Sequence, residues 1–194
     1  GLIKEGKFPP DKRVALSPEQ CQDIMRKFSS VSIYVQSSTV RCFTDEEYIN
    51  LGIEVVDDLS FCDVILGVKE VPVDMLLDNK IFFFFSHTIK KQSYNQTLLK
   101  QIIKKNIQLI DYETLVDDNG KRVIGFGRYA GIIGAYNTFL SYGLKTNEYV
   151  LSYAHKLLNK NQLDHQLSCV KLPSNFKIVL TGRGRVSQGV QEVL

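Results

Sequence analysis

The sequence lacks the features that would point to a metal, secreted or membrane protein. Its four cysteines, Cys21, Cys42, Cys62 and Cys169, form no C-x-x-C pair, and no His/Cys cluster has metal-site spacing. We therefore expect no bound metal and a reducing compartment. The longest apolar run, residues 81–85, has the length of one buried strand and falls well short of a membrane span. No signal peptide opens the chain, so we expect a cytoplasmic protein without membrane association.

A basic stripe of the kind that binds nucleic acid is also missing. The net charge is +3 and both signs are mixed along the chain. The pairs Lys90-Lys91 and Lys104-Lys105 fit the solvated edges of helices better than a nucleic-acid-binding surface. We therefore expect no nucleic-acid partner. With 194 residues, of which 44% are hydrophobic, the chain can form one large domain or two small ones with a sizeable core.

The first two thirds of the chain alternate between strand and helix patterns. Capping boxes predict helices after Ser17 (with Gln20) and after Thr44 (with Glu47, ending near Gly52). Apolar runs predict strands at residues 31–35, 53–56, 64–68, 81–85 and 107–110. A helix with apolar residues near positions 98–103 is predicted before the last of these strands. Strands that are apolar on both faces are typical of a parallel sheet covered by helices, so the pattern predicts an α/β fold.

The last third of the sequence shows mainly helix patterns rather than an alternation of strand and helix. A long helix is predicted over residues 129–142, closed by Gly143, and a second over residues 148–158. Residues 159–175 are polar and predicted to be irregular. We expect the domain change near the long helix, with a first domain at 1–128, an interdomain helix at 129–146 and a second domain from 147.

A glycine-rich turn lies near the end of the sequence. Residues 177–181 (KIVLT) predict a strand, Gly182-Arg-Gly184 a turn, and the apolar spacing after Gly189 a helix. Strand, glycine turn and helix form the context of a dinucleotide fingerprint, although Ser187 occupies the third glycine position. The acidic residue expected to bind the ribose would lie beyond Leu194, so we expect a fragment of a longer protein that binds dinucleotide poorly by itself. The alternative is a turn with no ligand.

Polar residues follow three of the predicted strands directly. Lys69 and Glu70 follow the strand at 64–68, His87 follows the strand at 81–85, and Glu113 follows the strand at 107–110. Ligands of open α/β sheets bind at the carboxyl ends of the strands, so these side chains predict a site for proton transfer. Each residue alone also fits a structural role, as a loop pair, a hydrogen-bonded histidine or a turn cap.

Several segments resemble the alanine dehydrogenase and saccharopine dehydrogenase superfamily, which includes the N-terminal domain of nicotinamide nucleotide transhydrogenase. They are D-K-R-V-A-L-S-P-E at residues 11–19, G-V-K-E at 67–70, F-F-S-H-T-I-K-K-Q at 84–92, L-I-D-Y-E at 109–113, F-G-R-Y-A-G at 126–131 and V-L-T-G-R-G-R-V-S-Q-G at 179–189. The segments at residues 84–92 and 109–113 look more like those of the saccharopine-forming branch than those of alanine dehydrogenase. The resemblance implies a Rossmann-like (flavodoxin-like) substrate domain followed by the start of a dinucleotide-binding Rossmann domain.

The resemblance also implies roles for individual residues. Lys69 and His87 match the family's acid–base pair, and Arg13 matches an arginine that binds a substrate carboxylate. Further substrate contacts are expected from Glu70, Glu113 and Arg128, and cofactor contacts from Gly182, Gly184, Arg185 and Val186. The implied reaction is reductive condensation of lysine with 2-oxoglutarate to give saccharopine, and its reverse, with NAD or NADP.

Three alternatives stay open at this stage. Glu70 resembles the fungal lysine-forming enzymes, because animal reductases have a basic residue there. The chain could instead belong to an alanine dehydrogenase acting on pyruvate and ammonia, or be a non-catalytic amino-acid-binding domain of the same fold. The sequence leaves open whether the protein is a homo-oligomer.

Overall fold

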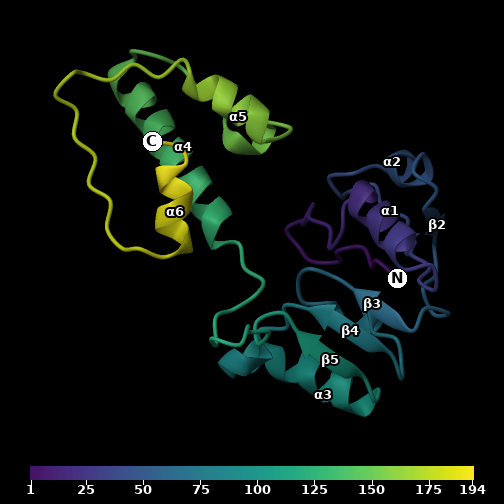
Figure 1. Ribbon diagram of the computed structural model, residues 1–194. Helices are drawn as coiled ribbons and strands as arrows, with labels where there is room; N and C mark the ends of the chain where they lie inside the picture. Colours follow the sequence, from purple (N-terminus) through teal and green to yellow (C-terminus); the bar gives the residue numbers. More distant parts are fainter. The chain divides into compact units, whose positions relative to one another are not determined.

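The computed structural model describes residues 1–194 and divides into two compact units, Gly1–Ile124 and Gly125–Leu194 (Figure 1). The first unit contains, in chain order, α1 (Pro18–Lys27), β1 (Tyr34–Gln36), α2 (Asp45–Ile49), β2 (Glu54–Val56), β3 (Val64–Leu66), η1 (Val73–Met75), β4 (Ile81–Phe84), η2 (Thr88–Lys90), η3 (Ser93–Asn95), α3 (Gln96–Lys104) and β5 (Gln108–Asp111). The second contains α4 (Gly127–Thr146), η4 (Ala154–Lys156), α5 (Lys160–Leu167) and α6 (Arg185–Gln191).

The strands of the first unit are all parallel, as the apolar runs predict. β1 pairs with β2, and β4 lies between β3 and β5. Leu2 forms parallel bridges to both Val35 and Leu66, and so joins the two groups of strands. The α/β fold with a parallel sheet is therefore present, and its carboxyl edge gathers the loops that follow β3, β4 and β5.

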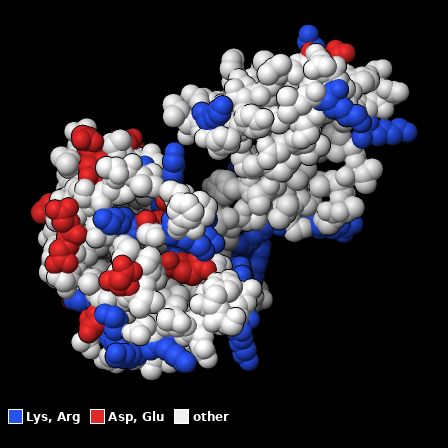
Figure 2. Space-filling model, turned by 180° about the vertical axis from the view of Figure 1, so that it is seen from behind, with Lys and Arg blue, Asp and Glu red and all other residues white.

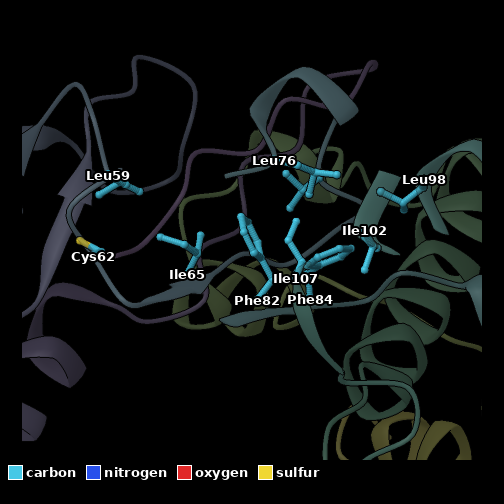
Figure 3. Packing of buried hydrophobic residues seen from close by; sticks show 10 residues of the cluster. Leu59, Cys62, Ile65, Leu76, Phe82, Phe84, Leu98, Ile102 and Ile107 are labelled. Carbon is cyan, nitrogen blue, oxygen red and sulfur yellow. The ribbon is translucent and has the colours of Figure 1, made fainter. Parts of the chain in front are cut away.

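Two apolar clusters hold the first unit together. The larger one lies between the β3–β4–β5 sheet and α3, and Figure 3 shows Phe82 and Phe84 in its centre. Both rings are fully buried, because alternate residues of β4 point to the same face of the sheet. The second cluster packs α1 and α2 against β1, with Tyr48 completely buried. These clusters fix the ends of the strands that carry the polar residues.

The two predicted capping boxes are confirmed. The Ser17 hydroxyl accepts from the Gln20 amide and the Gln20 side chain accepts from the Ser17 amide, and Thr44 and Glu47 do the same at α2. Gly52 follows α2 with φ +79°, a conformation that suits glycine.

In the second unit, three predictions about helices are wrong. The helix predicted at 148–158 is a short 3₁₀ turn, because Tyr149 and Leu151 are both buried, and their i, i+2 spacing fits extended chain rather than a helix. The segment predicted to be irregular contains α5, which starts at the cap Asn159. Helix α4 continues past Gly143 to Thr146, since Gly143 allows close contact with Tyr149 rather than ending the helix.

The strand predicted at 177–181 is not formed. The second unit contains no other strand with which it could pair, and Val179 is 86% exposed. A helix does follow the glycine turn, but α6 begins at Arg185 and ends at Gln191, whereas the sequence predicts the helix after Gly189. It packs on α4 rather than on a sheet. Gly189 faces the Arg128 carbonyl oxygen so closely that a Cβ would lie 1.8 Å from it.

Candidate active site

The polar residues predicted at the strand ends lie together in the first unit. The Nζ atom of Lys69 lies 3.3 Å from Nε2 of His87, and Nδ1 of His87 lies 2.9 Å from Oε2 of Glu113. Glu70 Oε1 lies 3.6 Å from the same Nε2 atom that faces Lys69, at the edge of the ring away from Glu113. β3, β4 and β5 thus bring four titratable groups to one edge of the sheet.

The His87 ring is held from several directions. Its backbone is left-handed, with φ 55°, which turns the chain sharply out of β4. Phe85 stacks on the ring with a centroid distance of 6.3 Å. Nδ1 faces both the Glu113 carboxylate, which can only accept, and the Lys90 ammonium at 3.2 Å, while Nε2 faces Lys69 and Glu70. Only 16% of the His87 side chain is exposed, so the site is shielded but still open to a ligand.

Neighbouring basic groups lower the pKa values of the Glu70 and Glu113 carboxylates. Burial would raise the pKa of Glu70, but the hydrogen bond from Lys7 and the nearby His87 outweigh it and lower the pKa below its usual value. The pKa of Glu113 is lowered in the same way, since hydrogen bonds with His87 and Lys90 outweigh its burial. Both groups therefore stay ionised near neutral pH beside the basic pair.

Four further residues of the cluster were not predicted. The Glu5 carboxylate accepts from the backbone amides of Val68 and Lys69, and burial raises its pKa. Lys7 pairs with Glu70; Lys90 and Arg122 pair with Glu113. Lys90 could have been predicted, because it lies three positions after His87 and one 3₁₀ turn brings it back toward the ring. Glu5 and Lys7 could not, since no pattern shows that residues 1–3 enter the sheet.

Arg13 is engaged within its own motif. Its Nε and NH2 groups both donate to the Asp11 carboxylate, in the forked geometry that suits a carboxylate ligand. The hydrogen bonds that the Arg13 guanidinium donates to Asp11 raise the pKa of Arg13, and the Arg13 side chain is 39% exposed. Its guanidinium therefore holds an internal carboxylate at the position for which the sequence predicts a substrate carboxylate.

The remaining predicted site residues lie in the second unit. Arg128, in the first turn of α4, forms two hydrogen bonds with Glu192, of 2.5 and 2.6 Å. Gly182 has φ +87°, and no atom lies within 4 Å of a Cβ placed on Gly182 or Gly184, so the turn suits close approach by a ligand. The strand that should precede it is absent, however, so we assign no chemical step to Gly182, Gly184, Arg185 or Val186.

Figure 2 shows Lys and Arg interspersed with Asp and Glu on the first unit, and mainly Lys and Arg on the second. The second unit has eight Lys and Arg residues and three Asp and Glu residues. No helix is long and apolar enough to cross a membrane.

Comparison with known proteins gives consistent relatives. The family described as alanine dehydrogenase/PNT, N-terminal domain, matches residues 1–133. The mitochondrial alpha-aminoadipic semialdehyde synthase of Rattus norvegicus is 34% identical over 94% of this chain and 21% of its own length. The saccharopine dehydrogenase [NAD(+), L-lysine-forming] of Yarrowia lipolytica is 31% identical over 66% of this chain and 35% of its own. This chain thus spans about a fifth of the first relative and a third of the second.

Solved structures show the same fold at low sequence identity. An L-alanine dehydrogenase matches with a TM-score of 0.55 and 20% identity, covering 75% of this chain and 40% of its own. A transhydrogenase from Sinorhizobium meliloti matches with a TM-score of 0.58 and 17% identity, covering 76% of this chain and 44% of its own.

Proposed function

Because this chain belongs to the alanine dehydrogenase/PNT N-terminal domain family, we propose that it is the substrate-binding part of a saccharopine-type dehydrogenase. The enzyme would interconvert saccharopine with lysine and 2-oxoglutarate, using NAD or NADP. The observation that carries this proposal is the contact of Lys69 with His87, braced by Glu113, at the carboxyl edge of the sheet. The names of the fungal relatives, which match 66% of the chain, support the same branch.

The geometry supports an acid–base role for His87. Its Nε2 atom lies between the ammonium of Lys69 and the carboxylate of Glu70. A neutral ring can accept a proton from Lys69 there, and a protonated ring can donate to Glu70. His87 can therefore take up and release the protons that amine attack on a ketone and loss of water require. The nicotinamide would supply the hydride.

Other residues of the chain would position the substrate. In the enzyme, a substrate carboxylate would bind the Arg13 guanidinium, either in place of Asp11 or together with it. Arg128 remains a proposed substrate contact, and Gly182, Gly184, Arg185 and Val186 remain proposed cofactor contacts. The surplus of basic residues in the second unit supports a phosphate-bearing cofactor there. A cytoplasmic location also stays a proposal, since the rat relative is named mitochondrial.

The test is oxidation of NADH and of NADPH by the enzyme that contains this chain, with lysine and 2-oxoglutarate as substrates. We expect turnover with this pair and a preference for one nicotinamide. Turnover only with pyruvate and ammonium would contradict the proposal and assign the chain to an alanine dehydrogenase. Binding of substrates without any turnover would favour a non-catalytic amino-acid-binding domain.

A further inference from the structure

A buried carboxylate stands at the end of β5, beside the candidate active site but outside the contacts described for it. Asp111 is the last residue of β5 and is only 7% exposed. It lies opposite Phe84, the last residue of the adjacent parallel strand β4. A buried carboxylate is costly unless its oxygens accept hydrogen bonds, and in Asp111 both oxygens accept them.

One oxygen of Asp111 binds the chain that leaves β4. The hydroxyl of Ser86, a completely buried residue, donates to Oδ2 at 2.5 Å. Ser86 Oγ in turn accepts from the Thr88 amide at 3.1 Å and lies 2.8 Å from the Thr88 hydroxyl. Because a carboxylate can only accept, the single hydroxyl proton of Ser86 points to Asp111, and the Thr88 hydroxyl donates to Ser86.

This network holds both residues that flank His87. Between Ser86 and Thr88, His87 has the left-handed angles φ 55° and ψ 9°. Residues other than glycine adopt that conformation rarely, and they keep it only where the surrounding structure holds it in place. The buried bonds from Thr88 to Ser86 and from Ser86 to Asp111 supply that constraint on the turn.

The other oxygen of Asp111 binds the chain that leaves β5. The backbone amide of Glu113 donates to Oδ1 at 2.8 Å, and the amide and hydroxyl of Thr114 both donate to the Asp111 carbonyl oxygen at 3.0 Å. These bonds set the direction of the turn in which the Glu113 carboxylate reaches Nδ1 of His87. One carboxylate therefore fixes the backbone on both sides of the contact between His87 and Glu113.

We propose that Asp111 is a positioning residue, which sets His87 and Glu113 relative to each other and acts on His87 through Ser86. Its two oxygens divide the task between the two strand ends. The consequence for turnover rests on the proposed function, whereas the placement of the His87 ring does not. Displacement of a reacting group by about 1 Å can cost about 10²-fold in rate, so a buried brace of this kind affects the chemistry without touching the substrate.

The first test is turnover of Ser86→Ala in the enzyme that contains this chain, with lysine and 2-oxoglutarate, expressed per folded enzyme. We expect kcat to fall about 10–100-fold, as for a misplaced acid–base group, with the KM for 2-oxoglutarate little changed. Ser37→Ala is the matched control, because it removes a hydroxyl–carboxylate hydrogen bond to Asp45 in the same unit, and it should keep full turnover. Unchanged kcat in Ser86→Ala would overturn the proposal.

A double-mutant cycle separates positioning from a general loss of stability. If Ser86 acts through His87, the change Ser86→Ala should cause no further loss of kcat in the His87→Ala enzyme. A further loss by the same factor as in the unaltered enzyme would show that Ser86 acts independently of His87, and would contradict the proposal.

The ring nitrogens of His87 provide a test that does not need the reaction. In long-range ¹H–¹⁵N spectra of the chain at neutral pH, the Nδ1 signal in Ser86→Ala should move toward its position in Glu113→Gln, which removes the same carboxylate partner. Ser37→Ala should leave the signal in place. Absence of turnover in the unaltered enzyme would contradict the proposed function alone, whereas an unmoved Nδ1 signal in Ser86→Ala would overturn the positioning role whatever the reaction.

Discussion

Nζ of Lys69 lies 3.3 Å from Nε2 of His87, although the two residues are eighteen positions apart in the sequence. The two residues follow adjacent parallel strands, β3 and β4, whose carboxyl ends lie at the same edge of the sheet. Two basic groups so close together are not both protonated without cost, and the carboxylates of Glu70 and Glu113 on either side of the ring offset that cost. The proposed acid–base role of His87 rests on this contact.

The first prediction concerns the role of His87 in turnover. In the enzyme that contains this chain, His87→Ala should lower the turnover number by about 10²–10⁴-fold, the usual contribution of a general acid–base group. Steady-state oxidation of the nicotinamide with saturating substrates measures it. His155→Ala, at an exposed histidine of the second unit, is the matched control and should retain full turnover. Full activity of the His87 variant would leave that residue with a structural role only.

The second prediction concerns Arg13 and a substrate carboxylate. Arg13→Ala should weaken binding of 2-oxoglutarate about tenfold or more, because it removes two charge-assisted hydrogen bonds. Isothermal titration calorimetry of the enzyme measures the affinity. Arg26→Ala, at an exposed arginine in the last turn of α1, removes the same charge and should bind as the unaltered enzyme does. Equal affinity in the two variants would show that Arg13 serves Asp11 alone.

The third prediction is a pH dependence of stability at Glu113. The pKa of Glu113 is below its usual value of 4.5, because hydrogen bonds with His87 and Lys90 outweigh its burial. The stabilisation is therefore complete above that usual value and is lost as the pH falls through the lower pKa of the folded state. Near neutral pH, Glu113→Gln should reduce the free energy of unfolding by about 1.5–3 kcal/mol, the range for hydrogen bonds to a charged group.

Urea unfolding of the chain, measured from neutral pH to about pH 3, checks this dependence. The difference between the unaltered chain and Glu113→Gln should shrink as the pH falls through the acidic range. Glu54→Gln, at an exposed position of β2, serves as the control and should change stability little. A difference that stays constant with pH would mean that the amide, rather than the lost charge, is responsible.

The sequence predicts the site better than it predicts the surrounding fold. Lys69, His87 and Glu113 could be placed together because each follows a strand that is readable from its apolar run, and parallel strands share a carboxyl edge. Lys7 and Glu5 could not be placed, since they depend on Leu2 joining β1 to β3 through backbone bridges that leave no apolar run. The positions of Glu5 and Lys7 in the site depend on these long-range backbone bridges, which no local sequence pattern predicts.

Local signals failed where packing outweighed them. The spacing that suggested a helix near Tyr149 came from side chains that pack on α4 in an extended segment. Gly143, a conventional helix terminator, instead lies inside α4 because Tyr149 packs against it. Residues 177–181 have a strand composition but no partner strand in the second unit, and a strand forms only when its backbone groups are paired.

The fourth prediction concerns the contact between α4 and α6. A Cβ on Gly131 would lie 2.0 Å from the Val186 carbonyl oxygen and 2.9 Å from the Val190 amide nitrogen, and these backbone atoms cannot rotate away. Gly131→Ala should therefore destabilise the second unit by about 1–3 kcal/mol, as overpacking usually does. Gly134 lies on the same helix with no atom within 4 Å of a Cβ, so Gly134→Ala should be neutral or stabilise by up to about 1 kcal/mol through helix propensity.

Amide hydrogen exchange over Arg185–Gln191 reads out this contact locally. Because α6 has seven residues, it is too short to persist alone, and its protection depends on packing against α4. Exchange of these amides should become faster in Gly131→Ala and stay the same in Gly134→Ala. Unchanged protection in both variants would contradict the close glycine contact. Loss of protection in both would instead point to a general sensitivity of α4 to substitution.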